Sequence, residues 1–225
     1  MTESIQLREF NPSTIPQNST CIIIGMRNTG KTTLIKDLLT YRKDVPYGVI
    51  ITPTDKNEYS GLVPDEQIHE TYSADIIKAV GKRQSQVISE YQKEVNEVGT
   101  SNIDRRGFLV LDNIMYDTSW IKDTLLHGFI MHTQSYQVSV LISMFYAMGI
   151  PPAIRSCFDY IFILRESIPA NRKRLYEHYA GMFPTFESFC QVMDEYTQGY
   201  NCLVINNSSK SAKVEDRVFY YNTKF

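Results

Sequence analysis

Short apolar runs alternate along the chain with longer segments in which apolar residues recur at helical spacing. The runs are nearly continuous in large apolar side chains, which is typical of strands that are buried on both faces. They cover residues 21–25, 47–52, 107–113, 137–146, 159–166, 201–207 and 217–222. Between them, the spacing predicts helices over residues 31–41, 73–98, 119–133, 169–180 and 185–197. If the long helix over 73–98 is broken, we expect the break near Gly81.

This alternation indicates the fold class. Strands separated by helices form a mainly parallel sheet with helices on both faces, so the sequence predicts an α/β fold. Only the polar residues 208–216 separate the last two runs, and we expect those runs as extra antiparallel strands at the C-terminal end. We predict a single domain over residues 1–225, in which residues 1–18 form an N-terminal extension.

Charge and cysteine content exclude several classes of protein. The formal net charge of −2 gives no general basic surface, so any contact with nucleic acid requires a local patch. The cysteines, Cys21, Cys157, Cys190 and Cys202, form no CxxC pair and indicate buried core residues in a reducing compartment. We find neither a secretory signal nor an apolar window of about 20 residues, and therefore expect a soluble intracellular protein with no membrane span.

Candidate chemistry begins at the stretch GMRNTGKTT, which lies between a predicted strand and a predicted helix. Its pattern, G-x-x-x-x-G-K-T, is that of a Walker A loop, whose backbone N–H groups and helix N-terminus bind phosphate. In such a loop, Lys31 would reach the β- and γ-phosphates, and Thr32 would place its hydroxyl on Mg²⁺. The predicted nucleotide-binding residues are Gly25, Met26, Arg27, Asn28, Thr29, Gly30, Lys31, Thr32 and Thr33.

A second feature is the stretch FLVLDN, in which four apolar residues precede Asp112. The carboxyl ends of the strands are where open α/β sheets bind ligands. An aspartate at that edge can hold the Mg²⁺ shell of a P-loop NTPase, so we predict Thr32 and Asp112 as metal residues and ATP and Mg²⁺ as cofactors. The loop-rich residues 53–72 would form an excursion beside this site.

Several longer stretches resemble one known family. They are REFNPSTI, GMRNTGKTTLIKDLL, SNIDRRGFLVLDNIMYD, MGIPPAIRSCFDYIFILRE, NRKRLYEHYAGMFPTFESFCQVMDEYT and CLVINN. Together they are similar to the poxvirus-type DNA-packaging ATPase of nucleocytoplasmic large DNA viruses, in the FtsK/HerA superfamily, from about residue 8 to residue 222.

The resemblance implies a P-loop ATPase that assembles into a homo-oligomeric ring and moves double-stranded DNA into a capsid. It also implies a capsid or portal component as a partner. The implied location is the host cytoplasm at viral assembly sites, or the virion itself.

The chain departs from this family at three positions around the γ-phosphate. Asn113 stands where the family has an acidic residue after the Walker B aspartate, and an amide cannot accept the proton of a water. Gln134 occupies the position of an arginine, and Phe145, before Tyr146, occupies that of a sensor glutamine. Because an arginine finger contributes about 10³–10⁵ in rate, we expect bound ATP to be hydrolysed slowly.

Other residues could substitute for the lost groups. Asp117 follows Asp112 by five positions, Glu166 follows the fifth predicted strand, and Arg155 lies in the GIPPAIR turn. For each of these three residues, the sequence is at least as compatible with a structural role as with a catalytic one. The predicted catalytic set is therefore Lys31, Asp112, Asn113 and Glu166.

Two other classes of function stay open at this point. A nucleotide-binding structural or regulatory subunit beside an active ATPase would account for the three departures. A nucleotide kinase would account for the size of the chain and for the arginine-rich segment RESIPANRKR, which resembles a phosphate lid. Basic pairs and triplets that could follow a DNA backbone in a ring occur at 42–43, 82–83, 105–106 and 172–174.

Overall fold

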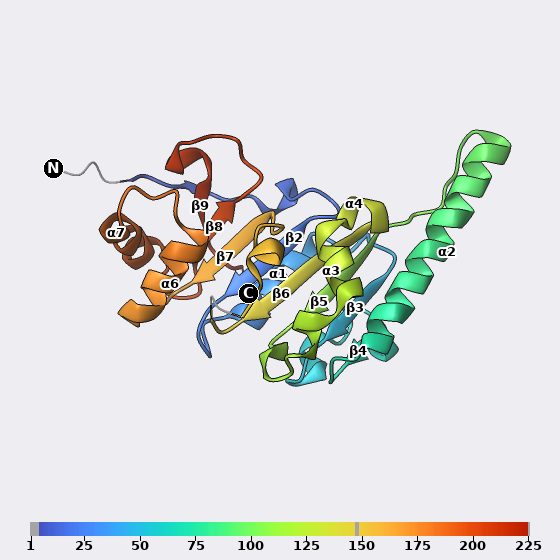
Figure 1. Cartoon of the computed structure of the whole chain (residues 1–225), viewed down its shortest axis with the longest axis horizontal. Coiled ribbons are helices and arrows are strands. Elements are labelled where there is room, and N and C mark those ends of the chain that lie inside the picture. Colours follow the sequence, from blue (N-terminus) through green and yellow to red (C-terminus); the bar gives the residue numbers. More distant parts are fainter. Residues whose placement is uncertain (1–4, 147–148, 225) are drawn as a thin grey trace.

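The computed structural model describes residues 5–146 and 149–224, which form an α/β fold around one nine-stranded sheet (Figure 1). Its strand order is β1-β9-β8-β7-β2-β6-β5-β3-β4. The strands are β1 (Arg8–Glu9), β2 (Thr20–Ile24), β3 (Gly48–Ile51), β4 (Ile68–His69), β5 (Gly107–Leu111), β6 (Val138–Met144), β7 (Tyr160–Leu164), β8 (Cys202–Asn206) and β9 (Val218–Tyr221).

The central strands are parallel, and antiparallel pairing enters only through β8. Strand β2 lies between β6 and β7, with Ile22 opposite Ile142 on one side and Ile161 on the other. Strand β8 pairs antiparallel with both β7 and β9. The amino end of β8 therefore lies at the same edge of the sheet as the carboxyl ends of the parallel strands. This arrangement confirms the predicted fold class, including the antiparallel C-terminal strands.

Helices cover both faces of the sheet because side chains alternate between the faces along each strand. Helix α1 (Lys31–Thr40) packs Leu34, Ile35 and Leu38 on the face that carries Ile23. The opposite face, which carries Ile22, is covered by α2 (Ala74–Val98), α3 (Thr124–Met131), α5 (Pro152–Arg155), α6 (Pro169–Tyr179) and α7 (Phe186–Tyr196). A further short helix, α4 (Thr133–Tyr136), precedes β6.

Helix α2 is continuous, so the expected break at Gly81 is absent. A Cβ atom added at Gly81 would lie 3.4 Å from both Leu125 and Phe129, which shows how closely α3 packs on this residue. Figure 1 shows that the C-terminal half of α2 extends beyond the sheet. Within the described ranges, no helix combines the length and apolar character that crossing a membrane would require.

The predicted helix over residues 119–133 is wrong in its bounds. A 3₁₀ turn (Ser119–Lys122) comes first, and α3 begins only at Thr124. The cause is Asp123, whose carboxylate accepts the backbone N–H groups of Leu125 and Leu126 at 2.9 and 3.1 Å and so caps the helix.

The described part of the predicted N-terminal extension packs against the sheet. Strand β1 pairs parallel with β9, and the Phe10 ring lies 5.7 Å from Tyr160 and 6.1 Å from Phe162, between ring centroids. Residues 1–4 of the extension, Met148 of the MGIPP stretch and Phe225 at the end of the predicted domain lie outside the described residues.

Candidate nucleotide site

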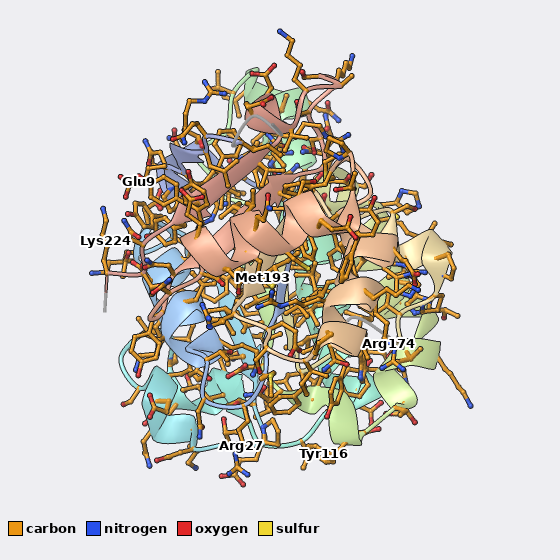
Figure 2. The ribbon with its side chains drawn as sticks, turned by 90° about the vertical axis from the view of Figure 1, so that its left-hand side faces the viewer. Glu9, Arg27, Tyr116, Arg174, Met193 and Lys224 are labelled. Atoms are coloured by element: carbon orange, nitrogen blue, oxygen red, sulfur yellow. The ribbon has the colours of Figure 1, made fainter. Side chains whose placement is uncertain are left out.

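The glycine loop joins the end of β2 to the start of α1, at the carboxyl edge of the sheet. Asn28 and Gly30 have positive φ angles of 63° and 96°, in the left-handed region that glycine and asparagine adopt most readily. Left-handed residues alternating with right-handed ones turn successive N–H groups toward one side, as an anion site requires. Figure 2 shows Arg27, from this loop, at the same edge of the molecule as Tyr116, which follows β5.

Lys31 is folded back over the loop that it follows. Its Nζ donates to the carbonyl oxygens of Gly25 and Met26 at 2.9 and 2.8 Å. The same Nζ lies 4.2 Å from the centroid of the Phe145 ring, in a cation–π contact. Burial lowers the pKa of Lys31 to about 8, against the opposing influence of the Asp112 carboxylate. The ammonium group is thus held at the loop by neutral carbonyl acceptors that an anionic phosphate could replace.

Asp112 is fully buried at the end of β5 and accepts hydrogen bonds from three hydroxyl groups. Thr32 Oγ1 and Tyr59 Oη each donate to its Oδ2 at 2.8 Å. Ser143 Oγ, from β6, donates to its Oδ1. Burial, followed by the charge of Asp112, raises the pKa of Tyr59 well above its ordinary value, so this phenol remains a neutral donor. The carboxylate is therefore fixed from three separate elements.

This pair of oxygen groups fits a magnesium ion. Mg²⁺ prefers oxygen ligands and is usually held by one or two protein groups together with substrate phosphates and water. Thr32 and Asp112 supply a hydroxyl and a carboxylate within hydrogen-bond distance of each other, beside the lysine that would meet the phosphates. The predicted metal pair is thus brought together in space, although 80 positions separate it in the sequence.

Asn113 and Phe145 lie beside this group, at the position expected for the γ-phosphate. Asn113 has a φ angle of 57°, and its backbone N–H donates to Ser143 Oγ at 3.0 Å. Its side-chain Oδ1 is buried and has no hydrogen-bond partner within the described protein. The amide can therefore bind a water or a ligand group, but it cannot act as a general base.

A cavity of about 560 Å³ connects these elements, which is a volume that suits a nucleotide. It is lined by loop and α1 residues, by the excursion after β3, by both positions beside the γ-phosphate site and by one tyrosine that precedes β8. The lining residues are Arg27, Asn28, Gly30, Lys31, Thr32, Thr33, Thr54, Asp55, Glu58, Asn113, Phe145 and Tyr200. The predicted excursion over 53–72 does border the site.

Glu166 follows β7, and its carboxylate accepts hydrogen bonds from two nearby residues of the same chain. It is buried, with Oε1 accepting from the backbone N–H of Ile168 at 2.8 Å and Oε2 from Asn171 Nδ2 at 3.1 Å. These bonds fix the start of α6. A catalytic role for Glu166 stays a prediction, and its present contacts are those of a structural residue.

The remaining predicted substitutes lie away from the cavity lining. Asp117 is partly exposed and accepts the backbone N–H of Ser119 at 2.8 Å. Arg155 borders a different cavity and lies 5.9 Å from the centroid of the Tyr179 ring. Neither residue reaches the γ-phosphate side of the nucleotide cavity within one chain.

Gln134 lies on α4, before the amino end of β6. Phe145 follows the carboxyl end of the same strand, which contains seven residues. Such a strand spans roughly 20 Å, so the two positions lie at opposite edges of the sheet. A group at position 134 therefore does not reach the nucleotide cavity of its own chain.

The arginines of the segment that resembles a kinase lid form contacts inside the fold. Arg172 makes a bidentate ion pair with Asp194 on α7, at 2.9 and 2.6 Å, and Arg165 approaches the same carboxylate at 3.9 Å. These contacts join α6 to α7, so the geometry does not favour the kinase alternative.

Sequence reasoning did not predict Tyr59, Ser143 or Tyr200, and it did not single out the lining residues Thr54, Asp55 and Glu58. Tyr59 comes from the loop-rich excursion, where no periodicity indicates which residue turns inward. Ser143 could have been predicted from the sequence, because it is the one residue with a hydroxyl group in the apolar run VLISMF. A polar residue buried in a central strand usually has a partner, which here is Asp112.

Comparison with known proteins finds relatives of this chain among uncharacterized viral proteins. No protein-family model matches the chain. Uncharacterized protein L437 of Acanthamoeba polyphaga mimivirus is 31% identical over 222 residues, which cover 97% of this chain and 78% of that protein. Uncharacterized protein 075L of invertebrate iridescent virus 6 is 32% identical over 221 residues, covering 96% and 81%.

Among solved structures, the chain is similar to a packaging NTPase of an archaeal virus. The genome packaging NTPase B204 of Sulfolobus turreted icosahedral virus 2, in complex with AMP, superimposes with a TM-score of 0.60. The match covers 96% of this chain and 100% of B204 at 13% identity, so it shows a shared P-loop NTPase fold. The chain belongs to the family of viral proteins that includes L437 of Acanthamoeba polyphaga mimivirus and 075L of invertebrate iridescent virus 6.

Proposed function

We propose that this chain is an ATP-hydrolysing subunit of a viral genome-packaging motor that moves double-stranded DNA into a capsid. One observation carries the proposal: Lys31, Thr32 and Asp112 meet at the edge of a nucleotide-sized cavity. The fold that presents them is shared with the genome packaging NTPase B204, which has been solved with AMP. The resemblance of the sequence to viral packaging ATPases supports the same assignment.

In this proposal the residues of the loop bind the triphosphate. Lys31 exchanges the carbonyl oxygens of Gly25 and Met26 for β- and γ-phosphate oxygens, and the left-handed residues Asn28 and Gly30 aim N–H groups at the phosphates. Thr32 and Asp112 would hold Mg²⁺, which neutralises phosphate charge when bound. Tyr59 and Ser143 keep the Asp112 carboxylate oriented.

Slow hydrolysis follows from the groups that face the γ-phosphate. Asn113 can orient a water through its unpartnered Oδ1 but cannot accept the proton of that water. Phe145 presents an aromatic ring where a hydrogen-bond donor would stabilise the transition state. Since one such donor contributes about 10²–10³ in rate, turnover should stay below about 1 per second without a partner.

A ring would bring groups of one chain to the nucleotide site of its neighbour. Because position 134 lies at the sheet edge opposite to the cavity, Gln134 would act on a neighbour's site, where a head-to-tail contact would place it. Our proposal includes a homo-oligomeric ring, a capsid or portal partner, and action at viral assembly sites in the host cytoplasm or in the virion.

A second candidate is a subunit that binds nucleotide without hydrolysing it. The observation in its favour is that Asn113 and Phe145, which both border the cavity, lack the chemistry of a base and of a sensor. Such a subunit would accompany an active ATPase.

Phosphate release from ATP, measured with and without duplex DNA, tests the proposal. We expect slow release that duplex DNA accelerates and that Lys31→Ala abolishes. Release at tens per second without DNA would contradict slow hydrolysis. Tight ATP binding with no release in either condition would favour the non-hydrolysing subunit.

A further inference from the structure

The nucleotide cavity extends past the glycine loop to an exposed aromatic side chain, Tyr200. This residue is 57% exposed, although it lines the cavity together with Gly30 and Thr33. An exposed aromatic ring inside a ligand cavity provides apolar surface that a ligand can cover. Tyr200 itself is not among the predicted site residues.

Tyr200 is held firmly against the start of α1. A Cβ atom added at Gly30 would lie 2.8 Å from Tyr200 Cδ1, so the ring already packs on the Gly30 backbone. Thr223, which follows β9, donates through Oγ1 to the Tyr200 carbonyl oxygen at 2.8 Å. The ring is therefore fixed relative to the loop that would bind the phosphates.

The C-terminal strand is itself tied to α1 through a buried carboxylate. Asp37, on α1, accepts from Tyr221 Oη at 2.7 Å and from the backbone N–H of Lys224 at 3.0 Å. Thr223 lies between these two residues. The glycine loop, α1 and Tyr200 therefore form one connected unit.

The sheet order gives the direction of a bound triphosphate. Asp112 and Asn113 follow β5, the glycine loop follows β2, and Tyr200 precedes β8. In the order β8-β7-β2-β6-β5, the loop lies between the metal side and Tyr200. A triphosphate whose γ end meets Asp112 thus points its nucleoside end toward β8.

We propose that the Tyr200 ring is the platform on which the nucleobase of the bound nucleotide stacks. This inference rests on the proposed function. It adds a contact with the base of the nucleotide to the contacts with its phosphates. Stacking uses the face of a base and not its hydrogen-bonding edge, so it tolerates different bases. The site therefore accepts nucleoside triphosphates with different bases, and ATP and GTP should bind with affinities that differ by less than about tenfold.

Titration calorimetry of the full chain with ATP, ADP and inorganic tripolyphosphate separates base binding from phosphate binding. Tyr200→Ala should lower the affinity for ATP and ADP by about tenfold and leave the affinity for tripolyphosphate unchanged. Tyr200→Phe keeps the ring and should bind all three as the original chain does. Tyr116→Ala is the matched control, because Tyr116 is 67% exposed at the same edge but does not line the cavity.

The outcomes distinguish this inference from the proposed function. Unchanged ATP affinity in Tyr200→Ala, or an equal loss of tripolyphosphate affinity, would overturn the stacking role while the phosphate site stands. If the unmodified chain binds neither ATP nor tripolyphosphate, both the stacking role and the proposed function fail. A Tyr200→Phe variant as weak as Tyr200→Ala would also overturn the role, because the ring alone would not account for binding.

Discussion

At the scale of single residues, the site is organised around one buried carboxylate. Asp112 receives hydroxyl groups from α1, from the excursion after β3, and from β6, through Thr32, Tyr59 and Ser143. A buried ionised carboxylate is costly unless its oxygens are hydrogen-bonded, and these donors meet that requirement. The same bonds fix the direction in which the carboxylate would meet a metal.

Replacing Tyr59 by Phe tests whether this orientation matters for binding. The change removes a hydrogen bond to a buried charge, so we expect a loss of about 1.5–3 kcal/mol in the free energy of unfolding. The Mg²⁺-dependent part of ATP affinity should fall by about tenfold, as is typical when a partner of a metal ligand is removed. Denaturant unfolding and calorimetry with and without Mg²⁺ measure the two effects.

Tyr72→Phe provides the matched control for that variant. Tyr72 Oη donates to Asp123 at 2.7 Å, so this change also removes a tyrosine–aspartate bond, but at the start of α3. It should lower stability and leave the ATP affinity unchanged. An equal loss of ATP affinity in both variants would show that Tyr59 acts only through stability.

Phe145 offers a test of the proposed slow hydrolysis. Phe145→Gln places an amide beside the γ-phosphate position, and a donor there should raise the rate of phosphate release by about tenfold or more. Phe145→Leu removes the ring without adding a donor, and it should leave the rate near that of the original chain. If the leucine variant accelerates release as much as the glutamine variant, the ring and not the missing amide slows the reaction.

At the scale of elements, the pattern of apolar positions predicts the long strands and the long helices, and the bounds of α1, α2, α6 and α7 agree to within one residue. Seven runs became strands because a parallel sheet buries both faces, which leaves a continuous apolar signal. The two-residue strands β1 and β4 carry no such signal, since pairing at a sheet edge depends on a distant partner. The start of α3 was detectable, because Asp123 is a typical N-cap residue.

The two halves of helix α2 differ in burial, although one helical pattern of apolar residues runs through both. Its buried residues, Ile77, Val80, Gly81 and Gln84, all lie in the first half. We expect the backbone amides of residues 87–98 to exchange hydrogen for deuterium faster than those of residues 77–84, because few packed contacts oppose local opening. Exchange followed by mass spectrometry measures this, and equal protection along α2 would contradict it.

At the scale of the whole molecule, the topology accounts for what the sequence could and could not predict about the site. Lys31, Thr32 and Asp112 follow strands, and strand ends share one edge, so their meeting was predictable. Tyr200 reaches that edge because β8 runs antiparallel to β7. The apolar pattern does not specify the register in which these two strands pair. Side-chain contacts such as that of Tyr59 depend on the path of a long loop.

The structure also shows which members of the basic groups in the sequence are bound within the protein and which are exposed. Each of the four basic groups noted in the sequence contains an arginine that is bound within the protein: Arg42 donates to Pro16, Arg83 donates to Gln84, Arg106 pairs with Asp44, and Arg172 pairs with Asp194. Lys82 and Lys173 are among the exposed members, which the proposed contact with a DNA backbone would use. A channel lined by repeated copies would therefore rely on few charges from each chain.

The central claim, that this cavity binds a nucleoside triphosphate in one direction, is tested most directly by a crystal structure with Mg²⁺ and a non-hydrolysable ATP analogue. We predict Lys31 on the β- and γ-phosphates, Thr32 and Asp112 at the metal, Asn113 and Phe145 facing the γ-phosphate, and the base on the Tyr200 ring. An analogue bound outside this cavity, or bound with its base toward Asn113, would contradict the account.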